Sequence, residues 1–263
     1  MATATEKTGF FCKWYAAPAI FAAAVAALAA VWAAAAPETV ARLFDGGGKA
    51  PVEIAALPFF ALIVPAVWMK PPFGGSRLRR NILCCAVTSV ALMAIVKETD
   101  LHNAALHLLY PDFTGEDGAL LPGLFKPNGA PLSGTPFKMR VLTNPGVPLG
   151  MKTLIVFYFA AFFGVFAAGF AYFAIPWIRG VFAFVPAAWT FGCLGATGVC
   201  VQVFDRLPAW RCEAARIAKD ALDPSFKAFC TCFEEGLEVV LALFGLLAVL
   251  QGAAALKATG ENR

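Results

Sequence analysis

The stretch that decides the fold, residues 229–256, has the sequence FCTCFEEGLEVVLALFGLLAVLQGAAAL. It is long enough to cross a bilayer as one helix, because a span needs about 20 mostly apolar residues. Three carboxylates, Glu234, Glu235 and Glu238, lie in its first half. Charge at the edge of a membrane helix is costly and is usually kept for a function. The stretch therefore predicts a membrane fold and a place to look for its site.

The composition of the whole chain agrees with a membrane protein. Of its 263 residues, 60% are hydrophobic and 14% are charged, whereas about a quarter of the residues of a soluble domain are charged. We expect an all-α fold, a polytopic membrane helix bundle that forms a single transmembrane domain over residues 1–263. The segments that approach or reach the length of a span are about 14–36, 51–69, 82–97, 153–175, 181–204 and 229–256.

The first of these six spans has features of a signal peptide. Lys7 and Lys13 precede an Ala-rich run that ends in Ala-Ala-Ala-Ala-Pro at residues 33–37. Its apolar run is longer than the roughly 7–15 residues of a signal-peptide core. We therefore expect a retained helix, and cleavage would remove one span without moving the others.

The positive charges orient the spans. Lys70, Arg77, Arg79 and Arg80 crowd one short connection without an acid, and such loops face the cytoplasm. Alternation then places both termini in the cytoplasm and the segments 37–50, 98–152 and 205–228 outside. All of the 17 carboxylates except Glu6 and Glu261 then fall on or near the outer face.

This topology brings two acidic clusters to the same leaflet. Lys97-Glu98-Thr99-Asp100-Leu101-His102 closes the third span, and Glu234, Glu235 and Glu238 open the sixth. On a continuous helix Glu98 and His102 would share a face, as would Glu234 and Glu238. We predict one outer polar site made of Glu98, Asp100, His102, Glu234, Glu235 and Glu238. In the alternative interpretation, nearby basic residues such as Lys97 only neutralise these acids.

Several chemistries fit such a site, and the sequence identifies no cofactor. Carboxylates with an imidazole can hold a divalent cation, for which the candidate ligands are Glu98, His102, Glu234 and Glu238. Two close carboxylates can also act as an acid and a base, and a carboxylate chain can relay protons or bind a coupling cation. Because His107 is five residues from His102, a metal site built from both histidines on one helix is not expected.

The outer segments offer further candidates. The loop 98–152 carries repeated turn signals, is too long for a simple connection, and is expected to fold over the outer mouth. Residues 208–227 are predicted to form a short amphipathic helix on the membrane surface. Cationic side chains that can bind a lipid headgroup, or balance the acids, are Lys138, Arg140, Lys152 and Arg206. Asp205 is the alternative partner of Arg206.

Four of the eight cysteines fall on the predicted outer side. In an oxidising compartment Cys212 can pair with Cys230 or Cys232. Cys-Thr-Cys at residues 230–232 is not a redox motif, and no four-ligand zinc spacing occurs. A disulfide and a set of packed thiols are the two alternatives.

The two acidic motifs resemble those of a loosely defined set of multi-pass bacterial inner-membrane proteins. That set has an Arg-Glu-Leu-Asp-x-His segment and a late Glu-Glu-x-x-Glu segment, and this chain has Lys97 in place of the arginine. The resemblance covers about a tenth of the chain and brings no established activity. It implies a location in the bacterial inner membrane.

Three functions remain open. The outer acidic site can bind a cation, a proton or a lipid headgroup. Alternatively, the chain is a membrane hydrolase or transferase for a lipid or lipid-linked substrate, with Glu98, Asp100 and His102 as acid, base or metal ligands. The third alternative is a structural or assembly subunit. Expected partners are membrane lipids, and a homo-oligomer or a partner subunit is compatible; no basic-aromatic pattern predicts nucleic-acid binding.

Overall fold

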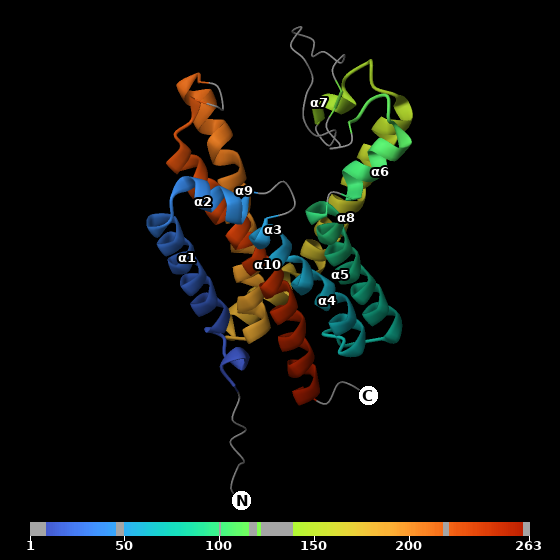
Figure 1. Ribbon diagram of the computed structural model, residues 1–263. Helices are drawn as coiled ribbons and strands as arrows, with labels where there is room; N and C mark the ends of the chain where they lie inside the picture. The colour runs from blue at the N-terminus through green and yellow to red at the C-terminus, as the bar shows by residue number, and fades with distance from the viewer. Residues whose placement is uncertain are drawn as a thin grey trace, which may run out of the picture. The chain divides into compact units, whose positions relative to one another are not determined.

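The computed structural model describes residues 9–45, 50–99, 101–115, 120–121, 139–217 and 221–259. These residues are mostly helical, and an isolated bridge between Thr114 and Leu120 is their recorded extended pairing. The helices (Figure 1) are η1 Phe10–Cys12, α1 Ala16–Ala34, α2 Pro37–Phe44, α3 Pro51–Ala55, α4 Leu57–Met69, α5 Arg77–Glu98, α6 Leu101–Leu109, α7 Met139–Leu142, α8 Leu149–Phe182, α9 Pro186–Ala215 and α10 Pro224–Thr259.

The chain divides into two compact units. Unit 1 contains residues 1–91 and 173–263, and unit 2 contains residues 92–172. Helices α5 and α8 each contribute to both units. The single transmembrane domain over residues 1–263 stays a prediction.

Five helical segments in the described residues are long and apolar enough to cross a membrane: Ala16–Ala34, Pro51–Met69, Arg77–Glu98, Pro186–Ala215 and Pro224–Ala258. They correspond to five of the six predicted spans. The remaining span, 153–175, lies within α8, where the described apolar stretch is the shorter Leu149–Ala161. The multi-pass helical fold is thus confirmed, and the sixth span stays a prediction.

Two boundaries differ from the predicted ones. Helix α8 continues to Phe182, past residue 175 where the predicted span ends, and the chain turns at residues 183–185, where Phe184 has a φ of 54°. Pro186, which lies inside the predicted span 181–204, begins α9. Proline suits the first helical position because it lacks the N–H that would have no partner there. The predicted span 51–69 consists of two helices, since α3 ends at Ala55 and α4 begins at Leu57.

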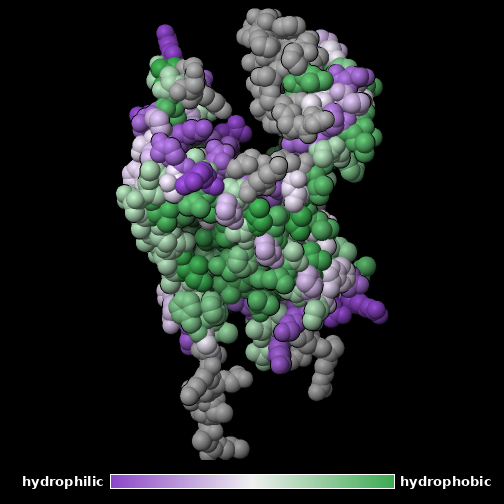
Figure 2. All heavy atoms as spheres, in the orientation of Figure 1, coloured by the Kyte–Doolittle hydropathy of each residue, from purple (hydrophilic) through white to green (hydrophobic). Residues whose placement is uncertain are grey.

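Helix α10 is the central element of unit 1 and contacts α1, α2, α3, α4 and α9. At its start, the Trp32 indole of α1 donates a hydrogen bond to the Ser225 carbonyl over 3.4 Å. Near its other end, a Cβ added to Gly252 would lie 2.8 Å from the Pro72 side chain, so the backbone there packs closely. On the visible face of unit 1, hydrophobic residues cover the middle of the helices and hydrophilic residues gather toward their ends (Figure 2).

A buried polar network joins three distant parts of unit 1. Thr190 donates from its hydroxyl to Gln251 Oε1 over 2.6 Å, and Gln251 Nε2 donates to the Phe11 carbonyl over 2.7 Å. Thr190 is fully buried, and Gln251 is 7% exposed. The network brings η1, which precedes α1, next to the last part of α10.

We expect Gln251→Leu to lower the free energy of unfolding by about 1–3 kcal/mol, because it leaves the buried Thr190 hydroxyl and Phe11 carbonyl without this partner. Thermal unfolding in detergent measures the change. Thr190→Val should cost less in the Gln251→Leu background than in the wild type, since the shared hydrogen bond is already lost. Additive losses would contradict the network.

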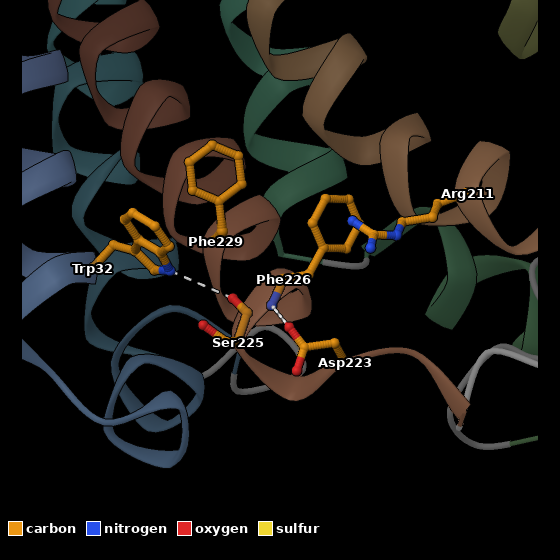
Figure 3. A pocket seen from close by; sticks show the side chains of 6 residues that line it. All are labelled: Trp32, Arg211, Asp223, Ser225, Phe226 and Phe229. Atoms are coloured by element: carbon orange, nitrogen blue, oxygen red, sulfur yellow. Dashed lines mark hydrogen bonds between the residues drawn. The ribbon is translucent and has the colours of Figure 1, made fainter.

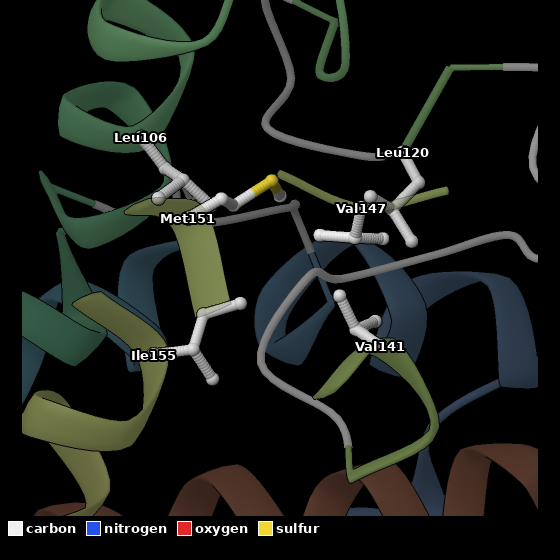
Figure 4. Packing of buried hydrophobic residues seen from close by; sticks show 6 residues of the cluster. All are labelled: Leu106, Leu120, Val141, Val147, Met151 and Ile155. Carbon is white, nitrogen blue, oxygen red and sulfur yellow. The ribbon is translucent and has the colours of Figure 1, made fainter. Parts of the chain in front are cut away.

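Unit 2 has its own hydrophobic core. Six buried residues form it (Figure 4): Leu106, Leu120, Val141, Val147, Met151 and Ile155. They come from α6, α7, the start of α8 and the intervening segments. Within the described part of the segment 98–152, which the turn signals predicted to be an outer loop, α6 and α7 pack against the start of α8. Residues 116–119 and 122–138 of this loop lie outside the described part of the chain.

Candidate functional site

The polar group at the end of α5 is built around an ion pair. Lys97 Nζ lies 2.8 Å from Glu98 Oε1, and the Glu98 side chain is only 10% exposed whereas that of Lys97 is 55% exposed. A lysine in the last turn of a helix also interacts favourably with the helix dipole. This ion pair compensates the charge of Glu98, as the alternative interpretation expects, and a functional role of Glu98 stays a prediction.

His102 lies on the next helix and not on a continuation of α5. Helix α5 ends at Glu98 and α6 begins at Leu101, so Glu98 and His102 do not share a helical face as predicted. At the break, the Thr99 hydroxyl donates to the Ile95 carbonyl over 2.6 Å, and such side-chain bonds to the backbone compete with helical ones. Asp100 lies outside the described residues.

The surroundings of His102 determine which ring nitrogen can act as a base. Its Nδ1 lies 3.1 Å from the Val96 carbonyl, and a carbonyl can only accept, so Nδ1 carries the proton. In the neutral ring Nε2 therefore has the lone pair that a proton or a metal would use. The ring stacks on Tyr158 of α8, with centroids 5.8 Å apart.

Tyr158 was not predicted as a site residue, because it lies inside an apolar run. Lys97 is close enough to its hydroxyl to act on it electrostatically. Unit 2 thus gathers a carboxylate, an ammonium, an imidazole and a phenol near the end of α5. This set offers acid and base groups.

The second histidine, His107, has a structural role. His107 lies on α6, and its Nδ1 donates to the Thr114 carbonyl over 2.7 Å. The Thr114 hydroxyl donates in turn to the Tyr110 carbonyl over 3.1 Å. His107 therefore fastens the chain that follows α6.

The carboxylates of α10 lie deeper along their helix than predicted. Helix α10 begins at Pro224 and not near residue 229, so Glu234 lies about 15 Å along the helix axis from its start at 1.5 Å per residue. Glu234, Glu235 and Glu238 are half-buried. Between them, Gly236 and Leu237 are buried against α1 and α9.

The direction of Glu238 follows from a residue two turns further on. Gly245 faces Ile63 of α4, since a Cβ added there would lie 3.0 Å from Ile63 Cδ1. Residues seven apart share a helical face, so Glu238 points toward the side where α3 and α4 pack on α10. Glu53 of α3 accepts a hydrogen bond from the Ala50 backbone N–H over 2.9 Å.

The predicted shared site draws residues from both units. Glu98 and His102 belong to unit 2, and the three α10 carboxylates belong to unit 1. Within the described residues, no three His, Cys, Asp or Glu side chains form a group that could hold a metal ion. The metal set Glu98, His102, Glu234 and Glu238 therefore needs ligands from both units and stays a prediction.

The cationic headgroup candidates have different surroundings. Arg206 Nε lies 3.3 Å from Asp205 Oδ2, and both side chains are exposed, which confirms the predicted local ion pair. Lys152 is half-buried in the first turn of α8. Lys138 and the side chain of Arg140 lie outside the described part of the chain.

The three cysteines that we predicted to pair, Cys212, Cys230 and Cys232, are buried free thiols in the structure. Cys232 Sγ donates to the Leu28 carbonyl over 3.7 Å, which links α10 to α1. These thiols pack between helices, as the alternative to a disulfide requires.

A pocket that the sequence analysis missed lies where α1 and α9 end and α10 begins. Its volume is about 300 Å³, and it is lined by Trp32, Arg211, Asp223, Ser225, Phe226 and Phe229 (Figure 3). Arg211 and Asp223 belong to the segment 208–227, predicted as a separate surface helix. Instead, α9 extends to Ala215 and α10 begins at Pro224, while residues 218–220 lie outside the described part.

Local sequence explains these two helix ends. Arg216 adopts the left-handed conformation that closes many helices, with φ 55°. Asp223 Oδ2 accepts the Phe226 N–H over 3.0 Å, as an N-cap does, and Pro224 occupies the first helical position.

The fold and its apolar helices are those of a multi-pass membrane protein. Comparisons of the chain with protein-family models, curated proteins and solved structures find no match. A more specific function therefore has to be inferred from the side chains of the candidate sites.

Proposed function

We propose that the protein is a six-span protein of the bacterial inner membrane, with cytoplasmic termini, that binds a cation at outer-leaflet carboxylates. The cation is a proton or a divalent metal ion. The observation that carries this proposal is the half-burial of Glu234, Glu235 and Glu238 within two turns of the central helix α10.

Negative charge at these three positions of α10 is energetically costly. Taking a carboxylate out of water is unfavourable unless its charge is compensated, and three carboxylates within five residues also repel one another. A bound cation reduces both costs. Because Gly236 and Leu237 are packed against neighbouring helices, the backbone that carries the carboxylates is held in place.

The rest of α10 supports binding over transport. Residues 239–250 contain no ionisable side chain, and five of them are buried: Val240, Ala242, Phe244, Leu247 and Val249. Ion pathways through membranes are usually marked by polar or ionisable groups. Along α10 the carboxylates therefore form the closed end of a site that is reached from one side.

A second candidate function is a lipid hydrolase or transferase that uses unit 2. The observation that favours it is the hydrogen bond from His102 to the Val96 carbonyl, which directs the basic lone pair of a neutral ring to Nε2. Glu98 and Tyr158 would then assist in proton transfer. An assembly role with a second copy or a partner subunit requires neither group.

We expect the purified protein to bind a divalent cation or a proton, and Glu234→Gln or Glu238→Gln to weaken binding by about tenfold or more, since each removes one charged oxygen ligand. Elemental analysis and Mn²⁺ and Ca²⁺ titrations measure metal binding. Infrared spectra against pH measure carboxyl protonation.

Glu38→Gln is the matched control, because Glu38 is exposed on α2 of the same unit. It should leave both readouts unchanged. Glu98→Gln tests whether unit 2 contributes to the same site. The proposal fails if wild type binds no metal and shows no carboxyl titration that Glu234→Gln or Glu238→Gln removes.

A further inference from the structure

We infer that the pocket between α1, α9 and α10 binds the headgroup of a zwitterionic phospholipid that carries a primary amine. In this assignment Arg211 binds the phosphate and Asp223 binds the amine, while Trp32 and Phe229 contact the start of the acyl chains. The pocket uses none of the α10 carboxylates, so it is a binding site separate from the proposed cation site.

The two charged side chains of the pocket favour a ligand with both signs of charge. Arg211 and Asp223 are exposed and form no ion pair with each other or with another described residue. A ligand that is only anionic would meet the Asp223 carboxylate, and one that is only cationic would meet the Arg211 guanidinium. A phosphate joined to an ammonium matches both.

The geometry of Arg211 suits a phosphate. Its guanidinium carbon lies over the Phe226 ring, 4.2 Å from the ring centre, within the range of a cation–π contact. The N–H donors lie at the edge of the guanidinium, where they can bind two oxygens of one phosphate. The contact with Phe226 therefore holds Arg211 in place, and the N–H groups at the edge of its guanidinium can bind the ligand.

Asp223 can serve the ligand without losing its role as a cap. Its Oδ2 accepts the Phe226 N–H, and a carboxylate has a second oxygen with further acceptor capacity. A primary ammonium can donate to that oxygen. A trimethylammonium has no N–H and cannot, so the pocket should distinguish ethanolamine from choline headgroups.

The aromatic side of the pocket leads from the helix ends along the apolar interior. Trp32 and Phe229 meet edge to face with centroids 5.1 Å apart (Figure 3). Phe229 contacts Phe204 and Phe233 in turn, at 5.5 and 4.8 Å. Tryptophan at helix ends is typical of the membrane interface, which is the depth of phospholipid headgroups. These rings favour a lipid over a soluble zwitterion.

The test is native mass spectrometry of the detergent-purified chain with equal amounts of dioleoyl phosphatidylethanolamine, phosphatidylglycerol and phosphatidylcholine. We expect wild type to retain phosphatidylethanolamine about tenfold better than either other lipid. Arg211→Gln should reduce that retention about tenfold, consistent with the loss of charge-assisted hydrogen bonds. Arg42→Gln removes an exposed arginine on α2 and should change nothing.

Asp223→Asn separates the amine contact from folding, because asparagine caps a helix about as well as aspartate. We expect this variant to keep the melting temperature of wild type, to retain phosphatidylglycerol, and to lose the preference for phosphatidylethanolamine. Equal retention of all three lipids by wild type, or unchanged retention by Arg211→Gln, would overturn the inference. Displacement by equimolar glycerophosphoethanolamine, which lacks acyl chains, would overturn the lipid assignment.

Discussion

Replacing Gly236 with alanine is expected to destabilise unit 1 by about 1–3 kcal/mol, the usual cost of overpacking. A Cβ at this position would collide with Leu28 Cδ2 and would lie 2.9 Å from Cδ1 and 3.1 Å from Cγ. Leu28 cannot easily move, because it packs against Cys232 and Leu237. The loss should occur although alanine favours a helix over glycine by about 1 kcal/mol. Thermal or denaturant unfolding in detergent measures it.

The matched control is Gly195→Ala on α9 of the same unit, where an added Cβ meets nothing within 4 Å. It should be neutral or slightly stabilising. Leu28→Ala should relieve the collision, so the double variant should be less destabilised than the sum of the single variants. A Gly236→Ala protein as stable as wild type would show that α1 does not approach α10 this closely.

Replacing Met151 with alanine is expected to destabilise unit 2 by about 2–5 kcal/mol, because the substitution leaves a cavity in its core. Met151 is fully buried among Leu106, Val147 and Ile155. Since these contacts lie within unit 2, the amides of residues 101–115 and 139–155 should exchange faster with deuterium. Those of α1 and α9 should keep their rates.

Leu149→Ala is the control for this prediction, because Leu149 is 80% exposed two residues earlier on α8. It should leave deuterium exchange close to that of wild type. Equal effects of the two substitutions, or faster exchange throughout the chain after Met151→Ala, would contradict a separate core in unit 2.

The spans could be predicted because the thickness of the bilayer sets a length that hydropathy alone can recognise. The helix ends could not be predicted as well. Helix α10 starts at Pro224, five residues before the predicted boundary, because Asp223 and Pro224 supply a cap and a first turn. Ser225 and Lys227 make that turn polar, so it falls outside an apolar run. Where a helix extends beyond the hydrocarbon core, its polar ends give no hydropathy signal.

The site was harder to predict because its parts depend on tertiary packing. The acidic motifs were visible in the sequence, yet the end of α5 at Glu98, which places His102 on α6, had no signal in the apolar pattern. The pocket joins Trp32 to residues nearly two hundred positions later. The core of unit 2 likewise joins the start of α8 to side chains of α6, α7 and the segments between them, which are distant in the sequence. Neither arrangement has a local pattern.

The hydrogen bond between Gln251 and Phe11 has a consequence for how the chain is made. The two residues are 240 positions apart, and at about 5–20 residues per second the ribosome needs about 12–50 s to go from one to the other. Leu28 and Trp32 of α1 must also wait for Cys232 and Ser225. The first span therefore enters the bilayer long before its partners exist. Its contacts with α10 can form only after residues 225–251 have been made.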